Sequence, residues 1–383
     1  MTSRPQLFAQ PLHVGCPNLG DRDRLLARFN DIVERRWLTN DGPYLREFEQ
    51  QVAEYLDVKH CIAVCNATIG LQLATSALGL RDEVIVPSFT FVATVHALMW
   101  QGIRPVFCDV DPTTHTIDPA AVERLIGPQT TGILGVHLWG NPCAIEALAE
   151  IADRRCLTLL YDAAHAFGCS HGGRMIGNFG SAEVFSFHAT KFLNTGEGGA
   201  VTTNDDDLAH KLRRLRSFGI EGDQVAGLGT NGKMNELSAA IGVTALESRD
   251  DFIARNHDNL TAYEDALAAA PGLKLCNLPT RERRNQQYVV VDVDDREAGL
   301  TRDEIVAALH TENVLAKRYF SPGCHRLEPY RSMHNAQRAP LPQTERLCDR
   351  LMQLPTGTSV SRADIARIGD FLQSLTSRAS NAA

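Results

Sequence analysis

Short, mostly apolar runs alternate with amphipathic stretches through the middle of the chain. The run 83–87 (EVIVP) is short and rich in β-branched side chains, which is typical of a buried strand. The stretch 119–126 favours a helix instead, because Asp118 can cap its first turn and Pro119 fits its first position. The same reasoning predicts strands at 61–65, 83–87, 104–109, 131–136, 157–161, 183–187 and 199–203, and helices at 67–78, 90–100, 119–126, 144–154 and 205–216.

This alternation of strands and helices predicts an α/β fold in which a largely parallel central sheet carries helices on both faces. In such sheets, ligands bind beyond the carboxyl ends of the strands. The segments that follow predicted strands are therefore the first candidates for a site, before any chemistry is considered. They are Asn66 and residues 87–90, 137–140 and 162–165.

The rhythm of strands stops near residue 235, where a long helical stretch over 235–255 begins. Beyond it we expect a strand at 287–293, a helix at 302–310, a strand at 315–319 and a last helix at 362–375. The small, polar tail 376–383 is expected to fray. The chain should therefore form a large domain over 11–250 and a smaller C-terminal α+β domain over 251–383.

The composition of the 383-residue chain, 44% hydrophobic and 22% charged, is that of an ordinary globular protein. Its net charge of −8 and the lack of a basic stripe argue against a nucleic-acid partner. We expect no membrane span, because no window of about 18 residues is apolar throughout. The first residues also lack the pattern of a signal peptide.

The ten cysteines are scattered and form no CxxC pair. Several of them, among them Cys61, Cys65, Cys108 and Cys156, stand in apolar runs. This usage predicts buried, reduced thiols in a cytoplasmic enzyme and no metal site.

Lys191 stands between an apolar strand and a glycine-rich turn, in the segment FSFHATKFLNTGEGG over 185–199. An amine at a strand end can form a Schiff base with an aldehyde if it loses its proton. Asp162 follows the apolar run 157–161, so it also stands at a strand end, where it could pair with a pyridinium nitrogen or simply cap a helix. The two strand ends are neighbours in the predicted sheet, so Lys191 and Asp162 could lie on opposite sides of one flat cofactor.

A phosphate site is the second chemical feature that the residues suggest. Asn66, Ala67 and Thr68 open a predicted helix, and its free N–H groups together with the Thr68 hydroxyl favour a phosphate. A plain helix cap would look the same. Ser186 could offer a further hydroxyl, or it could be a serine satisfied within the core.

Several segments, in this order along the chain, resemble the DegT/DnrJ/EryC1/StrS family of sugar aminotransferases. The resemblance extends from about residue 11 to about residue 375. The segments are WLTNDGP at 37–43, NAT at 66–68, VIVPSFTFVAT at 84–94, PVFCDVD at 105–111, DAAHA at 162–166, SFHATK at 186–191, TGEGG at 195–199 and NGKMNEL at 231–237.

The resemblance implies the type I fold of enzymes that use pyridoxal 5'-phosphate (PLP). Lys191 would carry the cofactor as a Schiff base and move the proton during the reaction. Asp162 would pair with the pyridine nitrogen, Phe91 would stack on the ring, and His165 would lie near the phenolic oxygen.

The phosphate would be held by Ala67, Thr68 and Ser186, as the resemblance also implies, and Asn66, at the start of the same helix, is a further candidate for binding the cofactor. Asn231 would reach the phosphate of the neighbouring subunit, so that a homodimer would share its active sites.

The chain departs from the family pattern at three positions. His165 stands where the family often has Gln, Gly232 where many members have an aromatic residue, and Lys233 where many have Arg. These changes resemble a subgroup that acts on dTDP-linked keto-sugars. Some relatives are dehydratases in which histidine replaces the lysine, whereas this chain keeps Lys191.

Three further residues are candidates for contacts with the sugar. Tyr319 and His325, in YFSPGCH over 319–325, resemble a family segment near the sugar site. His188 lies three residues before Lys191. A structural role is equally compatible with either histidine.

The sequence therefore predicts a PLP-dependent aminotransferase that moves an amino group from glutamate to a nucleotide-linked keto-sugar. The expected acceptor is a dTDP-4-keto-6-deoxyhexose, which would give a 4-amino product. Three alternatives stay open at this point: amination at C3 of a dTDP-3-keto-sugar, a PLP-dependent sugar dehydratase, and a non-catalytic sensor of the same fold.

Overall fold

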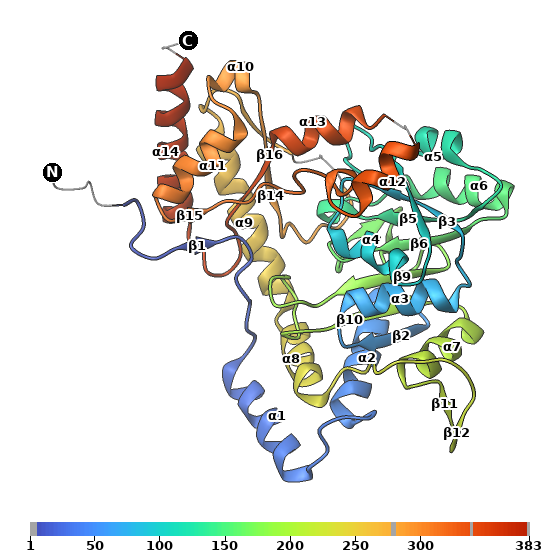
Figure 1. The fold of residues 1–383 in the computed structure, drawn as a ribbon. Coiled ribbons are helices and arrows are strands. Elements are labelled where there is room, and N and C mark those ends of the chain that lie inside the picture. The colour runs from blue at the N-terminus through green and yellow to red at the C-terminus, as the bar shows by residue number, and fades with distance from the viewer. Residues whose placement is uncertain (1–5, 277–280, 338–339, 381–383) are drawn as a thin grey trace.

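A seven-stranded sheet stands at the centre of the molecule, a computed structural model that describes residues 6–276, 281–337 and 340–380 (Figure 1). The strand order is β2-β10-β9-β6-β5-β3-β4, and only β10 runs against its neighbours. The predicted, mostly parallel sheet is therefore confirmed. Its strands are β2 (His60–Val64), β3 (Glu83–Pro87), β4 (Arg104–Cys108), β5 (Thr130–Val136), β6 (Thr158–Asp162), β9 (Ala182–Ser186) and β10 (Gly199–Thr203).

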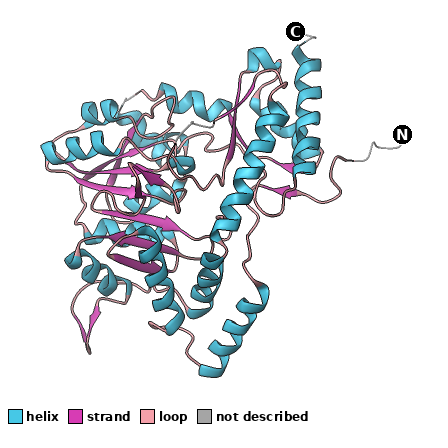
Figure 2. Cartoon of the chain, turned by 180° about the vertical axis from the view of Figure 1, so that it is seen from behind, coloured by secondary structure: helices cyan, strands magenta, loops and turns pink. Residues whose placement is uncertain are grey.

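Helices cover both faces of this sheet (Figures 1 and 2). Side chains alternate along a strand, so Val84 and Val86 of β3 face one layer and Ile85 faces the other. The first layer contains α3 (Ala67–Ala77), α4 (Val92–Met99) and α7 (Asp206–Arg216). The second contains α2 (Pro43–Leu56), α5 (Pro119–Leu125), α6 (Ile145–Arg155) and α8 (Glu236–Glu247).

The C-terminal part of the chain forms a separate apolar core around a three-stranded antiparallel sheet. The long helices α9 (Arg249–Leu267) and α14 (Arg362–Ser380) lie side by side against it (Figure 1). The other elements of this part are β13 (Leu273–Leu275), β14 (Val289–Val293), α10 (Asp295–Ala298), α11 (Arg302–Thr311), β15 (Val314–Leu315), η2 (Cys324–Arg326), α12 (Tyr330–Gln337), α13 (Pro342–Arg350) and β16 (Leu351–Leu354).

The N-terminal segment reaches across to this second core before the chain enters the large sheet. Strand β1 (Leu12–His13) pairs in parallel with β15, and Phe8 is buried among the C-terminal apolar residues. Helix α1 (Arg22–Arg35) follows. The expected boundary at residue 250 falls at the start of α9. The division into 11–250 and 251–383 stays a prediction, and the contacts of β1 favour counting the first residues with the smaller unit.

Three local expectations were wrong. The helical stretch over 235–255 is two helices, α8 and α9, which meet at Ser248. The strand expected at 315–319 is only β15, because the chain turns at Tyr319 and Phe320. The tail does not fray from residue 376, since α14 continues to Ser380 and the buried Thr376 bonds to the Leu372 carbonyl.

Two short hairpins lie outside the two larger sheets. The hairpins are β7 (Ser170–His171) with β8 (Arg174–Met175), and β11 (Ile220–Glu221) with β12 (Gln224–Val225).

All ten cysteines are free thiols, but Cys16 and Cys156 are exposed, contrary to the expected burial of Cys156 in its apolar run. Among the residues that the structure describes, no helix has both the length and the apolar character that a bilayer crossing requires.

Candidate active site

The carboxyl edge of the large sheet brings together the residues that follow its strands, as the topology rule predicted. Asp162 ends β6, Ser186 ends β9, and Asn66 comes two residues after β2. Lys191 lies in the loop between β9 and β10. The short η1 helix (Leu138–Gly140) follows β5 at the same edge.

Asp162 is a buried carboxylate with two donors. Its Oδ2 accepts a hydrogen bond from the Thr94 hydroxyl at 2.8 Å, and its Oδ1 accepts one from the Ala164 N–H at 3.0 Å. Burial raises the pKa of the Asp162 carboxyl, and the two hydrogen bonds and nearby Lys191 oppose that rise. A carboxylate held in this way is suited to face a cationic nitrogen in a dry site.

Lys191 has an amine that is easily deprotonated. Burial lowers the pKa of Lys191 from 10.5 to about 8, with Asp162 opposing the change and Lys317 adding to it. Its Nζ donates a hydrogen bond to Tyr288 Oη at 2.9 Å. An amine in this range can act as a nucleophile or as a base near neutral pH.

Aromatic rings from both halves of the chain form one wall of the site. Trp139 and Phe320 stack with centroids 5.6 Å apart and planes at 14°, and His165 lies nearly parallel to Phe320 at 8°. The aromatic wall consists of Phe89, Trp139, His165, Tyr288, Tyr319 and Phe320. Flat faces of this kind suit a flat or sugar-like ligand.

Trp139 is held at the centre of this wall in an unusual conformation. Its backbone has φ 59°, a left-handed value that bulky residues rarely adopt. Its indole Nε1 donates to His115 Nδ1 at 3.2 Å, and its N–H donates to His165 Nδ1 at 3.4 Å. Because a backbone N–H can only donate, the neutral His165 ring carries its proton on Nε2. Burial keeps the pKa of His165 well below 6.5, so the ring is neutral.

The first turn of α3 and the start of β10 form a cradle for an anion. Asn66 caps the helix by accepting from the Ile69 N–H at 2.9 Å, which leaves the N–H groups of Ala67 and Thr68 without an acceptor inside the helix. Gly199 pairs with Ser186 on β9, and a Cβ at Gly199 would come within 2.7 Å of the Ala67 nitrogen. The cradle therefore needs a glycine at this position and has the Ser186 hydroxyl at its side.

Three predicted residues lie in more exposed places. His188 is about half exposed, and its Nδ1 bonds to Thr190 Oγ1 at 2.9 Å. Phe91, at the N-terminus of α4, keeps 61% of its surface exposed. Asn231 is exposed on the segment that follows the β11–β12 hairpin. Their roles toward a ligand stay predictions.

The two residues from the YFSPGCH segment have different surroundings. Tyr319 belongs to the aromatic wall, with its ring centroid 5.0 Å from that of Trp139. His325 is only 3% exposed, and its Nδ1 bonds to Ser88 Oγ at 2.7 Å. Contact of either residue with a sugar stays a prediction, and for His325 the bond to Ser88 shows a structural role as well.

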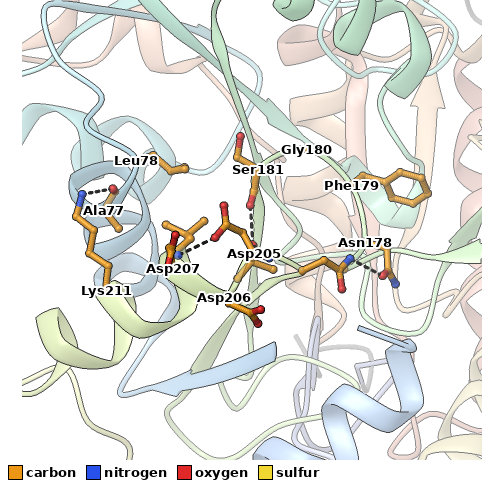
Figure 3. Close-up of a pocket in the computed structure, with 14 residues that line it drawn as sticks. Ala77, Leu78, Asn178, Phe179, Gly180, Ser181, Asp205, Asp206, Asp207 and Lys211 are labelled. Carbon is orange, nitrogen blue, oxygen red and sulfur yellow. Dashed lines mark hydrogen bonds between the residues drawn. The ribbon is translucent and has the colours of Figure 1, made fainter. Parts of the chain in front are cut away.

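A cavity of about 940 Å³ lies elsewhere and is not this site (Figure 3). It lies at the opposite edge of the sheet, between the end of α3 and the start of α7, and contains neither Lys191 nor Asp162. Figure 3 shows Asp205, Asp206 and Asp207 there, with Lys211 bonded to the Ala77 carbonyl. The amine of Lys211 is thus bonded to a backbone carbonyl, and the candidate site remains the edge with Lys191 and Asp162.

Comparison with known families identifies the chain. The profile described as the DegT/DnrJ/EryC1/StrS aminotransferase family matches residues 20–373. The chain belongs to the DegT/DnrJ/EryC1/StrS aminotransferase family. The resemblance read from the sequence motifs is therefore confirmed, and the aminotransferase has the fold of its relatives.

Individual relatives of the aminotransferase carry informative names. The dTDP-4-amino-4,6-dideoxy-D-glucose transaminase of Shigella dysenteriae is 35% identical over 82% of this chain and 85% of its own. The GDP-perosamine synthase of Caulobacter vibrioides is 34% identical over 93% of this chain and 96% of its own. A crystal structure of DesI in the presence of its TDP-sugar product is 48% identical, with a TM-score of 0.94 over 99% of this chain and 96% of that one.

The sequence did not indicate the roles of three residues of the site, which are Thr94, Trp139 and Tyr288. Thr94 lies in a family motif, and Trp139 lies in a segment at the carboxyl end of a predicted strand. Their places near the site were therefore predictable, but their contacts were not. Tyr288 stands just before β14 in the C-terminal part, and nothing local marks it as a neighbour of Lys191.

Proposed function

We propose that this aminotransferase uses PLP to move an amino group from glutamate to C4 of a nucleotide-linked 4-keto-6-deoxyhexose, with dTDP as the nucleotide. The observation that carries the proposal is Lys191, an amine of lowered pKa, beside the buried Asp162 in a member of this family. The choice of C4 and of a thymidine nucleotide is supported by the names of the Shigella relative and of the DesI complex.

The residues present fit PLP. Asp162 suits the pyridine nitrogen, because a buried carboxylate stabilises a proton on that atom. The α3 cradle with Ser186 suits the phosphate, and the Gly199 backbone leaves room for it. The neutral His165 has Nε2–H available for an oxygen of the ring, and Phe91 is exposed enough to cover a ring face.

When bound, the cofactor supplies an electron-withdrawing ring that acidifies the carbon next to the transferred nitrogen. Lys191 is the group that takes and returns the proton of that carbon, since its pKa near 8 allows both states near neutral pH. Asp162 keeps the ring nitrogen positively charged. The aromatic wall excludes water from this side of the site and orients the sugar.

We further propose that the enzyme is a cytoplasmic homodimer with shared active sites. The segment before Asn231 carries exposed apolar side chains, with Val225 at 74% and Leu228 at 91% exposure. A second copy that covers them would bring Asn231 toward the neighbouring phosphate cradle. The β11–β12 hairpin projects from the body of the subunit, as such an exchange requires (Figure 1).

Absorption spectroscopy tests the cofactor. The purified protein should show a band near roughly 400–430 nm that glutamate shifts to about 330 nm, as expected for a lysine-bound PLP. Lys191→Ala should lose this response. A wild-type protein that binds no PLP would favour the sensor of the same fold over an enzyme. A Lys191→Ala variant that keeps the glutamate-dependent shift would contradict the role proposed for Lys191.

A panel of 4-keto and 3-keto sugar nucleotides with isotope-labelled glutamate tests the reaction. We expect label in a 4-amino sugar, identified by product mass and by NMR of the amine-bearing carbon. Label at C3 would replace the proposed position. Loss of a hydroxyl without transfer of label would identify a dehydratase.

A further inference from the structure

Tyr288 is the hydrogen-bond partner of the catalytic lysine, and it comes from the C-terminal part of the chain. Lys191 Nζ donates to Tyr288 Oη at 2.9 Å and lies 5.6 Å from the centre of the tyrosine ring. Lys191 belongs to a loop of the large sheet, whereas Tyr288 immediately precedes β14 of the small sheet. The contact therefore joins the two halves of the molecule at the reacting amine.

The Tyr288 hydroxyl accepts a hydrogen bond from the catalytic lysine. A lysine ammonium can only donate, so the Tyr288 oxygen is the acceptor of this bond. Tyr319 is a ring neighbour of Tyr288, with centroids 5.9 Å apart and planes at 47°. Tyr288 therefore lies beside both the amine and a residue expected at the sugar.

The Tyr288 ring is fixed by its neighbours in the aromatic wall. His165 lies at a centroid distance of 4.3 Å, and Trp139 meets the ring edge-on at 5.6 Å and 65°. Burial raises the pKa of Tyr288 well above 10, so the hydroxyl keeps its proton. A neutral hydroxyl on an immobilised ring is a fixed point to which a flexible side chain can be held.

We propose that Tyr288 is a positioning residue that holds the free amine of Lys191 in place for proton transfer. The inference rests on the proposed function, because the amine must be free during each half of the reaction. A lysine side chain has four rotatable bonds, and proton transfer requires it in one geometry. The hydroxyl supplies that geometry without taking part in the chemistry.

The groups around Lys191 determine whether its pKa should rise or fall when the Tyr288 hydroxyl is removed. Asp162 favours the ammonium form, whereas Lys317 and burial disfavour it, and His165 is a neutral neighbour. The Tyr288 oxygen accepts a bond from the ammonium and therefore also favours the charged form. Removing the hydroxyl should lower the pKa of Lys191 below about 8.

The first test uses the cofactor-free protein, so it is independent of any activity. Amine labelling at a series of pH values, read by mass spectrometry of the peptide with Lys191, gives the pKa of this lysine. Tyr288→Phe keeps the ring and should lower that pKa by about one unit, as a lost hydrogen bond to a charged group would. An unchanged pKa would overturn the proposal.

Tyr263→Phe is the matched control. Tyr263 is a buried tyrosine of the same C-terminal part, and its hydroxyl donates to the Pro355 carbonyl at 2.8 Å. This variant also loses one buried hydroxyl and one hydrogen bond, but it lies in the other core. It should leave the Lys191 pKa and the activity unchanged. An equal pKa drop in Tyr263→Phe would mean that general destabilisation, and not positioning, explains the result.

The second test separates proton transfer from binding. In Tyr288→Phe, the rate constant for reaction with glutamate should fall by about tenfold, and KM should stay within about twofold. The kinetic isotope effect with α-deuterated glutamate should rise, since proton transfer becomes slower than the other steps. A raised KM with normal kcat would assign Tyr288 to substrate binding and overturn the proposal.

The two tests also separate this inference from the proposed function. If wild-type protein transferred no amino group to any keto-sugar, the proposed function would fail while the labelling experiment could still be read. If transfer were normal and Tyr288→Phe kept a wild-type pKa and isotope effect, only the positioning role would fail.

Discussion

The Thr94 hydroxyl donates a hydrogen bond to Asp162 Oδ2 at 2.8 Å, from helix α4 to the last residue of strand β6. Both side chains are buried, with Thr94 at 1% and Asp162 at 6% exposure. The bond therefore acts in a low-dielectric place, where a lost donor to a carboxylate is costly. Thr94 also bonds to Thr90 one turn earlier, so the donor itself is held.

We predict that Thr94→Val raises the pKa of Asp162 and weakens cofactor binding. Valine keeps the shape of threonine but leaves Oδ2 without this donor, and burial already pushes the Asp162 pKa upward. A lost hydrogen bond to a charged group is worth about 1.5–3 kcal/mol, so affinity for PLP should fall by roughly 10- to 100-fold. Titration of cofactor-free protein with PLP, followed by absorption, measures the effect.

Thr94→Ser is the control for this prediction, because it restores the hydroxyl and loses only a methyl group. It should bind PLP within a few-fold of wild type. If the serine variant were as weak as the valine variant, packing around α4 and not the bond to Asp162 would be responsible.

The central sheet was predictable because its strands are covered on both faces. Strands such as β3 and β10 are buried along their whole length, so they appear in the sequence as short apolar runs. Asp162 and Lys191 were found for a related reason, since Asp162 ends such a run and Lys191 lies in the loop that follows one, near the sheet edge. The family motifs then supplied roles that a single strand end does not specify.

The errors lie where packing between distant segments decides the structure. Thr376 is buried and Gly369 packs against Ala266, so α9 holds α14 in place beyond its apolar pattern. Tyr288 reaches Lys191 only because the C-terminal part folds back over the large sheet. No local spacing encodes such contacts, which is why the partner of the lysine escaped the sequence reasoning.

A pH-dependent contribution of Lys191 to stability is expected in the cofactor-free protein. Its folded-state pKa of about 8 lies below the ordinary 10.5, so the unfolded state binds more protons between these values. Stability should therefore rise with pH across this window. The shift corresponds to roughly 3 kcal/mol, and partial exposure of the side chain reduces the expected effect to about 1–2 kcal/mol.

Urea unfolding of wild type and Lys191→Met at pH 7 and pH 10 isolates this contribution. Other titrating groups affect both proteins alike, so the difference between the two free energies of unfolding is the relevant quantity. Lys191→Met should be the more stable protein at pH 7, and its advantage should shrink at pH 10. If the difference in the free energy of unfolding between the two proteins did not change with pH, burial would not have lowered the pKa of Lys191.

Gly70 should be essential for the close approach of α3 to the sheet. A Cβ at this position would lie 2.9 Å from Val184 Cγ1 and 3.3 Å from Val64 Cγ2. Gly70→Ala should therefore cost about 1–3 kcal/mol of stability through overpacking. The substitution should also displace the N-terminus of α3 and so weaken phosphate binding. Urea unfolding measures the loss of stability, and titration with PLP measures the loss of affinity.

Gly127→Ala is the comparison for this substitution, because nothing lies within 4 Å of its Cβ position. This variant should unfold like wild type and bind PLP normally. Equal losses in both variants would remove the special role of Gly70, and a stable Gly70→Ala protein would mean that α3 can shift without strain.

Complementation between inactive variants should reveal a shared active site. Lys191→Ala removes the amine, and Asn231→Asp places a negative charge where the neighbouring phosphate is proposed to bind. Each homodimer should be inactive. A purified heterodimer of the two variants has one site with both native residues if Asn231 acts across the interface, so it should recover about half of the wild-type activity.

A chain that carries both substitutions, paired with wild type, gives the opposite pattern. With shared sites, each site of this heterodimer has one altered residue, and the protein should be inactive. If Asn231 acted within its own subunit, the wild-type subunit would keep one intact site, and the results of the two heterodimers would be exchanged. The pair of measurements thus decides between the two arrangements, because each arrangement makes a different heterodimer the active one.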